Sequence, residues 1–318
     1  MDRRQVLGLG LAAPALLSTA RAQAGPLRVI FPFAAGGVGD ALSRIMADEL
    51  SRALGEPAIM EARPGAGGQL GLQAVRNAAP DGRTLLMTPI APIVIHPIIY
   101  PNLPYDPFRD LAPISQIATF DFCLAVGPAT PATTLAEFIT WVKQDPRRGS
   151  YGSPGAGTLP HFFGLMMGRA TGIEVTHVAY RGSAPALTDL IGGQVPMVMT
   201  TTSDVVEFAK AGRVRVLAVS GQTRSPFLSD VPTFTELGVP VAGNAWYAAY
   251  TGAGVPQAQV ERLNRAIVAA VAAPATRDRI LGLSLVPTGT SGADLAAIQR
   301  ADFEHWGPAV RASGFKPD

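Results

Sequence analysis

The chain has 318 residues, of which 47% are hydrophobic and 16% charged, with 26 basic against 24 acidic side chains. This near balance leaves no charge excess that would favour nucleic acid or an acidic membrane as a partner. The length predicts two domains, and the single cysteine, Cys123, excludes a disulfide framework and a zinc site built on a cysteine cluster.

The first 24 residues have the pattern of a secretory signal peptide. Arg3 and Arg4 precede an apolar run from about Val6 to Leu17, and Ala22-Gln23-Ala24 offers a small-residue cleavage site. The arginine pair indicates the twin-arginine export route. A membrane anchor is the competing interpretation, but the run is shorter than the roughly 20 residues that span a bilayer. Cleavage after Ala24 removes three arginines and one aspartate, and leaves 23 residues of each sign.

Short apolar, β-rich runs alternate with helical patterns along most of the chain. The runs LRVIF (27–31), PAIME (57–61) and TLLMT (84–88) are separated by expected helices over about 40–54 and 69–78. Such alternation is typical of β-α-β units around a mostly parallel sheet. The proline-rich segment YPNLPYDPFRDLAP (100–113) is expected to be neither helix nor central strand.

The pattern resumes at FCLAV (122–126). A helix is expected from Thr134, where Thr134 and Glu137 have the spacing of a capping box, and it ends before Pro146. Further helices are expected over 158–171, 184–191, 205–211 and 257–272, and further strands at 175–180, 195–200, 214–220 and 246–252. Two sets of units predict two α/β lobes, with a ligand cleft lined by the loops at the carboxyl ends of the strands.

Two glycine-rich loops follow the first two strands. In FPFAAGGVGD (31–40), Gly36 and Gly37 leave backbone N–H groups unobstructed at a helix start, which favours an anion. Because the stretch is not G-x-G-x-x-G and no Walker lysine follows, nucleotide binding is not indicated, and Asp40 is interpreted as a helix cap. In ARPGAGGQLG (62–71), direct ligand contact and a plain turn stay open, and Arg63 is expected in an internal salt bridge.

The stretch SYGSPGAGTLPHFFGLMM (150–167) poses the choice between an enzyme, a phosphate-binding protein and a receptor. Ser153 does not fit the nucleophile pattern G-x-S-x-G, and nothing nearby suggests a carboxylate to orient a base. His161 is expected to pack or hydrogen-bond locally in the first turn of the helix. N–H and hydroxyl groups at a helix start instead predict a clamp for a carboxylate. The four histidines are scattered, so neither a metal site nor a cofactor is expected.

Two more stretches are candidates for ligand contact. In AYRGSAPALTDLIGGQV (179–195), Arg181 is a candidate for a bidentate carboxylate contact, although a salt bridge at the rim is equally compatible. The hydroxyl cluster from Thr200 to Ser203 either caps the following helix or lines the cleft. Trp246 is expected in the core or the cleft wall.

In order and spacing, the chain resembles the extracytoplasmic substrate-binding proteins of tripartite tricarboxylate transporters, the Bug-type receptors. The resemblance runs from Leu27 nearly to the end and rests on fragments such as FPFAAGGVGDALSR, EARPGAGGQLGLQAV, YDPFRDLAPIS, YGSPGAGTLPH and THVAYRGSAPALTDLIGGQV. It implies a periplasmic receptor that is not an enzyme, with the type II periplasmic-binding-protein fold. It also implies that backbone N–H groups, hydroxyls and waters from both lobes hold a small carboxylate.

Carried over residue by residue, the resemblance completes the expected site. Its members are Phe33, Ala35, Gly36 and Gly37 in the first loop, Ser153, Gly155, Ala156, Gly157, Thr158 and His161 in the clamp, Tyr180, Arg181 and Gly182 at a third edge, and Ser203. The expected lobes are 25–121 with 244–318, and 122–243. The expected partners are membrane transporter subunits or a sensor protein, and the chain is expected to be a monomer.

Three positions depart from the family pattern. Pro196 replaces a usual aspartate, Ala62 replaces a common asparagine, and FFGLMM (162–167) lacks an acidic residue often found there. The last departure suggests a ligand with an aromatic or extended hydrocarbon part. A secreted hydrolase that uses Ser153 and His161, and a receptor that signals without transport, are the alternative functions.

Overall fold

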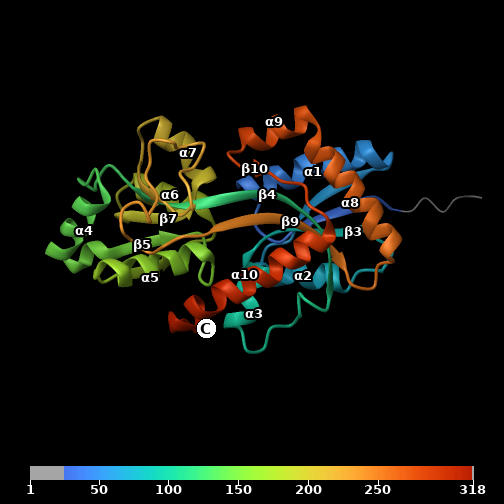
Figure 1. Ribbon diagram of the computed structural model, residues 1–318, viewed down its shortest axis with the longest axis horizontal. Helices are drawn as coiled ribbons and strands as arrows, with labels where there is room; N and C mark the ends of the chain where they lie inside the picture. The colour runs from blue at the N-terminus through green and yellow to red at the C-terminus, as the bar shows by residue number, and fades with distance from the viewer. Residues whose placement is uncertain (1–24, 317–318) are drawn as a thin grey trace, which may run out of the picture.

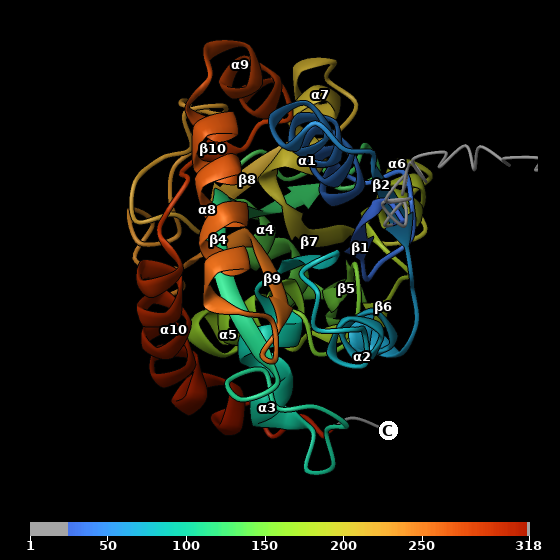
Figure 2. The same ribbon diagram turned by 90° about the vertical axis from the view of Figure 1, so that its right-hand side faces the viewer.

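The structure is a computed structural model that describes residues 25–316, so the predicted signal peptide lies outside the described residues. Figure 1 shows two groups of helices and strands, one at each end of the molecule, joined by two long strands that run side by side. These strands are β4 (Leu111–Val126) and β9 (Asn244–Gly252). In Figure 2, α8 and α10 lie on the left side of these strands, and α2 and α6 lie on the right.

The N-terminal group is built on parallel strands. β1 (Leu27–Phe31) lies between β2 (Ala58–Ala62) and β3 (Thr84–Pro89), and β9 then pairs with β3 in the antiparallel direction. Helices α1 (Val38–Leu54) and α2 (Gln69–Arg76) follow β1 and β2. α1 buries Leu42, Met46 and Leu50, which share one face at a spacing of four residues.

The second group repeats this alternation. Its parallel strands stand in the order β7 (Met197–Thr201), β5 (Ser150–Ser153) and β6 (Thr176–Ala179). Each is followed by a helix, namely α5 (Leu159–Thr171) after β5, α6 (Ser183–Ile191) after β6 and α7 (Thr202–Lys210) after β7. The remaining strand, β8 (Arg215–Val219), pairs with β4.

β4 connects the two groups because it changes its partner strands along its length. Its pairing with β9 ends at Asp121 opposite Asn244, and its pairing with β7 begins at Phe122 opposite Thr201. Both pairings are antiparallel. One strand thus passes from the first group to the second between residues 121 and 122.

Helices close the chain against these strands. The C-terminal elements are α8 (Gln257–Ala272), α9 (Pro274–Gly282), β10 (Val286–Pro287) and α10 (Gly292–Ala312). The remaining elements are η1 (Ala66–Gly68), η2 (Ala91–Ile95), α3 (His96–Ile99), α4 (Leu135–Gln144) and η3 (Pro146–Gly149). α10 packs on β4, η2 and α3, and Figure 1 shows its C-terminal end below α5. No helix within residues 25–316 is both long enough and apolar enough to cross a membrane.

Most predicted elements are confirmed, with three differences. The sheet holds parallel strands at both ends, but β4 and β9 cross its middle in the antiparallel direction. The short helices η2 and α3 were not predicted. Thr134 caps α4 as expected by accepting the Glu137 N–H, but the Glu137 carboxylate accepts the N–H of Thr133 instead of closing a box on Thr134.

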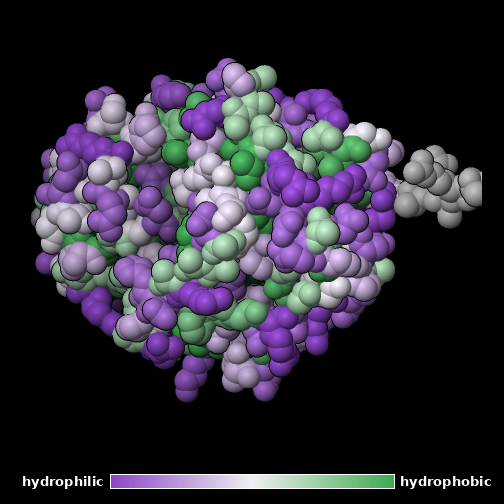
Figure 3. All heavy atoms as spheres, turned by 45° about the vertical axis from the view of Figure 1, so that its right-hand side comes forward, coloured by the Kyte–Doolittle hydropathy of each residue, from purple (hydrophilic) through white to green (hydrophobic). Residues whose placement is uncertain are grey.

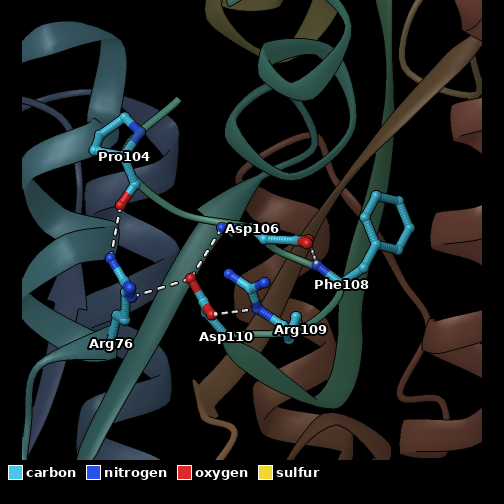
Figure 4. Close-up of polar contacts among 6 residues, drawn as sticks. All are labelled: Arg76, Pro104, Asp106, Phe108, Arg109 and Asp110. Carbon is cyan, nitrogen blue, oxygen red and sulfur yellow. Dashed lines mark hydrogen bonds and ion pairs between the residues drawn. The ribbon is translucent and has the colours of Figure 1, made fainter. Parts of the chain in front are cut away.

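The proline-rich segment is held in place by side chains rather than by regular structure. Figure 4 shows Arg76 of α2 donating to the Pro104 carbonyl at 2.7 Å and pairing with Asp110 at 3.0 Å. Asp110 also accepts the Asp106 N–H at 2.9 Å. Residues 100–110 therefore match the prediction, whereas 111–113 are the start of central strand β4, so the prediction was wrong for these three.

An open hollow beside this segment is lined by Tyr100, Leu103, Phe108 and Phe303, among others. On the face drawn in Figure 3, hydrophobic and hydrophilic side chains are interspersed.

Candidate ligand-binding site

The loop after β1 leaves its backbone open at the start of α1. Ala35, Gly36 and Gly37 are exposed, and Phe33 is half-buried against Phe31, with the ring centroids 5.8 Å apart. Gly36 has φ 101°, a value that L side chains rarely adopt. Gly37 is the N-cap of α1, and no side chain caps it. An uncapped helix start presents N–H groups and a partial positive charge to an anion.

Asp40, in the first turn of α1, stabilises this loop. Its side chain is buried, accepts the Gly36 N–H at 3.3 Å and pairs with Arg44 at 3.2 Å. Asp40 was expected to cap α1, but the N-cap is Gly37 and no side chain caps it; Asp40 lies in the first turn and holds the preceding loop instead. The carboxylate is already occupied by these two partners.

The loop after β2 supports the loop after β1. A methyl group on Gly68 would lie 3.2 Å from the Phe33 ring, and one on Gly67 would lie 3.2 Å from His96. Arg63 pairs with Glu61 at 2.6 Å, which confirms its predicted salt bridge. The two loops therefore form one packed unit at this edge of the sheet.

The clamp loop after β5 turns its hydroxyl groups inward. The Ser153 side chain is fully buried, donates to the Gly155 carbonyl at 3.1 Å and lies 2.7 Å from Nε2 of His177. Thr158 Oγ1 donates to the same carbonyl at 2.7 Å. Ala156 is exposed, and Thr158 begins α5 without a side-chain cap. The hydroxyls shape this loop, and the start of α5 is left to receive an anion.

His161 holds the clamp loop from within α5. It is buried, its Nδ1 accepts the Gly157 N–H at 3.1 Å, and its ring stacks on His177 at 3.9 Å. Local hydrogen bonding, as predicted, is thus confirmed. Burial, together with the neighbouring His177, lowers the pKa of His161 to about 3, and burial lowers the pKa of His177 to about 4. Both rings are therefore neutral at neutral pH.

His177 is a residue that sequence reasoning missed. It lies on β6, whose parallel register places it opposite Tyr151 and two residues before the partner of Ser153. The alternating pattern of VTHVAY fits a strand, but it gives no sign of a contact with Ser153. The hydrolase alternative paired Ser153 with His161; the structure pairs it with His177. Within residues 25–316, no carboxylate is hydrogen-bonded to either histidine.

The third edge is joined to the clamp through the backbone. Tyr180 and Gly182 donate their N–H groups to the carbonyls of Ser153 and Pro154, at 2.9 and 3.1 Å. The Tyr180 hydroxyl donates to Asp189 at 2.8 Å, and burial and this carboxylate raise the pKa of Tyr180 to about 12. Arg181 is exposed. Tyr180 thus fastens the loop with its hydroxyl, which is not left for a ligand.

The four hydroxyl residues at the start of α7, Thr200 to Ser203, differ in their contacts. Thr200 Oγ1 donates to Ser183 at 3.0 Å, and Thr201 Oγ1 donates to Asp204 at 2.5 Å. Ser203 is half-buried in the first turn of α7. Thr202 Oγ1 is buried and has no hydrogen-bond partner in the described part of the chain.

Tyr247 of β9 connects the starts of α1 and α7. A methyl group on Gly39 of α1 would lie 2.8 Å from the Tyr247 ring. Burial raises the pKa of Tyr247, and the Asp204 carboxylate of α7 raises it further, which indicates that this charge is near. The first loop and the start of α7 therefore border the same crossing strand. The other expectation for β9 is also met, since Trp246 is core and donates to Asp302.

Two of the departures from the family pattern, Phe163 and Pro196, make structural contacts. Phe163 of α5 packs on Phe122 and Trp306, with ring centroids 5.1 and 5.5 Å apart. Pro196 supplies a carbonyl to Thr130 Oγ1 at 2.7 Å. Phe163 therefore faces the core and α10.

Comparisons with known proteins agree with this arrangement. A family model described as tripartite tricarboxylate transporter family receptor matches residues 42–315. A UPF0065 protein of Bordetella bronchiseptica is 33% identical over 314 residues, which cover 96% of this chain and 93% of the relative. Protein BugT of Bordetella pertussis is 29% identical over 309 residues, which cover 96% and 94%.

Solved structures show the same fold. Rpa4515 of R. palustris with adipate has a TM-score of 0.87 at 29% identity, and the match covers 92% of this chain and 98% of that one. MatC of Rhodopseudomonas palustris with bound malate has a TM-score of 0.83 at 28% identity, covering 90% and 98%. These matches confirm the predicted periplasmic-binding-protein fold, and the matching proteins are substrate-binding proteins rather than enzymes.

Proposed function

Because this chain belongs to the tripartite tricarboxylate transporter receptor family, we propose that it captures a small carboxylate and delivers it to the membrane subunits of such a transporter. Receptors of this family are periplasmic. Export by the twin-arginine route with cleavage after Ala24 is part of the proposal. Delivery to a transporter rather than to a sensor rests on the family description alone.

The two lobes of the proposed receptor are 25–121 with 244–318, and 122–243. The change of partner strands in β4 between Asp121 and Phe122 supports this division. Only β4, β9 and the loop before β9 would then connect the lobes through the backbone. A junction of this kind allows a hinge motion that closes the lobes over a ligand.

The main support for a carboxylate ligand is the pair of helix starts, at α1 and α5, that no side chain caps. α1 belongs to one proposed lobe and follows an exposed, glycine-containing loop; α5 belongs to the other and follows a glycine-containing loop in which Ala156 is exposed. Such helix starts bind anions through N–H groups without a paired charge. We assign the contacts to the backbone N–H groups of residues 33–37 and 155–158 other than those of Gly36 and Gly157, which donate to Asp40 and His161, with Arg181, Gly182 and Ser203 at the rim.

The side-chain hydroxyls have a supporting role in this proposal. Ser153, Thr158 and Tyr180 already bond to protein groups, so they fix the loop that presents the N–H groups. The neutral His161 and His177 add no positive charge to the site. Recognition by backbone N–H groups therefore selects a negatively charged ligand. The length of the ligand depends on the space between the lobes.

Calorimetric titration of the mature chain tests the proposal. The panel consists of mono- and dicarboxylates, aromatic acids and amino acids, each with its uncharged amide as the matched control. We expect saturable binding of one carboxylate class, with micromolar affinity equivalent to about 8 kcal/mol, no binding of the amide, and recovery of the ligand unchanged. Equal binding of acid and amide, absence of binding across the panel, or chemical conversion of the ligand would contradict it.

A further inference from the structure

The last described residues form a contact with the clamp loop that the proposed function does not require. α10 ends at Ala312, and Gly314 follows in a left-handed conformation with φ 72°. This turn leads the chain to Phe315, which is partly buried. Its ring lies edge-on to His161, at 4.7 Å between centroids and 86° between planes.

The same helix end is tied to α5 at two further points. Arg169 of α5 donates to the Ala312 carbonyl at 3.1 Å, and Phe315 also packs on Phe162 at 5.8 Å. Nearer the middle of α10, Trp306 packs on Phe163 of α5. The position of Phe315 over His161 is therefore set by a helix-to-helix interface, not by a single contact.

Gly157 lies beneath two side chains from this side of the molecule. A methyl group on Gly157 would lie 2.7 Å from Cδ1 of Ile99 and 3.6 Å from Cε1 of Phe315. Ile99 belongs to α3, and α3 packs against α10. The peptide that donates to His161 is thus covered by the proposed first lobe, although it belongs to the second.

A continuous row of contacts leads from this cover to the end of β5. Phe315 contacts His161, His161 stacks on His177, and His177 reaches Ser153 at 2.7 Å. His161 also holds the Gly157 N–H. The His161 ring therefore holds the Gly157 peptide, which immediately precedes the N-cap of α5.

We infer that Phe315 is a positioning residue for the ligand site: together with Ile99, it presses His161 and Gly157 into the conformation that presents the start of α5. This inference rests on the proposed function for its ligand. The cover comes from one proposed lobe and the clamp from the other, so this contact joins the two lobes next to the clamp.

The test compares Phe315→Ala with Phe315→Tyr, which keeps the ring edge, and with Phe108→Ala as the matched control. Phe108 is an exposed phenylalanine that contacts α10 through Phe303 at 5.3 Å. The readouts are affinity for the carboxylate found by titration and the exchange rate of the Gly157 amide measured by NMR without ligand. For F315A we expect about tenfold weaker binding and about tenfold faster exchange, and wild-type values for F315Y and F108A.

Unchanged affinity and unchanged Gly157 exchange in F315A would overturn the inference, as would equal losses in F108A. If F315A does not fold, Ile99→Ala removes the second side chain over Gly157 and is measured in the same way, with the same two outcomes. A wild-type chain that binds no carboxylate would overturn the proposed function instead. The exchange rate of Gly157 would still decide the role of Phe315, because that measurement needs no ligand.

Discussion

At the scale of single residues, the site depends on two buried, neutral histidines. Sequence reasoning placed His161 correctly in the first turn of its helix and expected a local hydrogen bond. It missed His177, because a contact between neighbouring strands depends on their register, which no short pattern encodes. The Gly157 N–H donates to Nδ1 of His161, so this ring carries its proton on Nε2.

The protonation of these rings is a testable consequence. NMR titration of the folded protein should show His161 and His177 neutral from pH 8 to about pH 5, because burial lowers their pKa values to about 3 and 4 from 6.5. Nitrogen spectra should show His161 with its proton on Nε2. A midpoint near 6.5 for either buried ring would contradict the described packing.

The same lowered pKa values should make the free energy of unfolding depend on pH. Between about pH 6.5 and pH 4 the unfolded chain binds protons at these histidines and the folded chain does not, so the free energy of unfolding falls as the pH is lowered through this range. His96, whose pKa burial lowers to about 4, contributes in the same direction. Urea unfolding at several pH values measures this slope. Replacing His177 with Gln should reduce the slope.

At the scale of elements, the clamp depends on close packing between α5 and β5. A methyl group on Gly164 would lie 2.2 Å from the ring of Tyr151, whose hydroxyl donates to the His161 carbonyl at 2.7 Å. Tyr151 is fully buried, so it has little room to move. Glycine at position 164 therefore allows the helix to lie against the strand that ends in Ser153.

Replacing Gly164 with Ala should destabilise the protein by about 1–3 kcal/mol, because a well-packed contact is overfilled. Urea unfolding would measure the loss. Gly282→Ala is the matched control, since a methyl group there meets nothing within 4 Å and α9 gains helix propensity of up to about 1 kcal/mol. Similar free energies of unfolding for the two variants would argue against the α5–β5 contact described here.

At the scale of the whole molecule, local signals predicted the elements better than their partners. Caps and apolar periodicity identified the cores of α1, α4 and α8, and the strand at 246–252. The antiparallel course of β4 and β9 was not predicted, because strand propensity does not specify which strand pairs with which. The contact of Phe315 with His161 could not be predicted from local patterns either, because it joins residues 154 positions apart.

Hydrogen–deuterium exchange, with and without the carboxylate identified by titration, tests the central claim most directly. If two helix starts from two lobes hold the ligand, uptake should fall together in the peptides that cover 33–41 and 153–162, and should stay unchanged in the peptide that covers 100–110. Protection at only one of the two loops, or only at 100–110, would contradict a ligand held between the lobes.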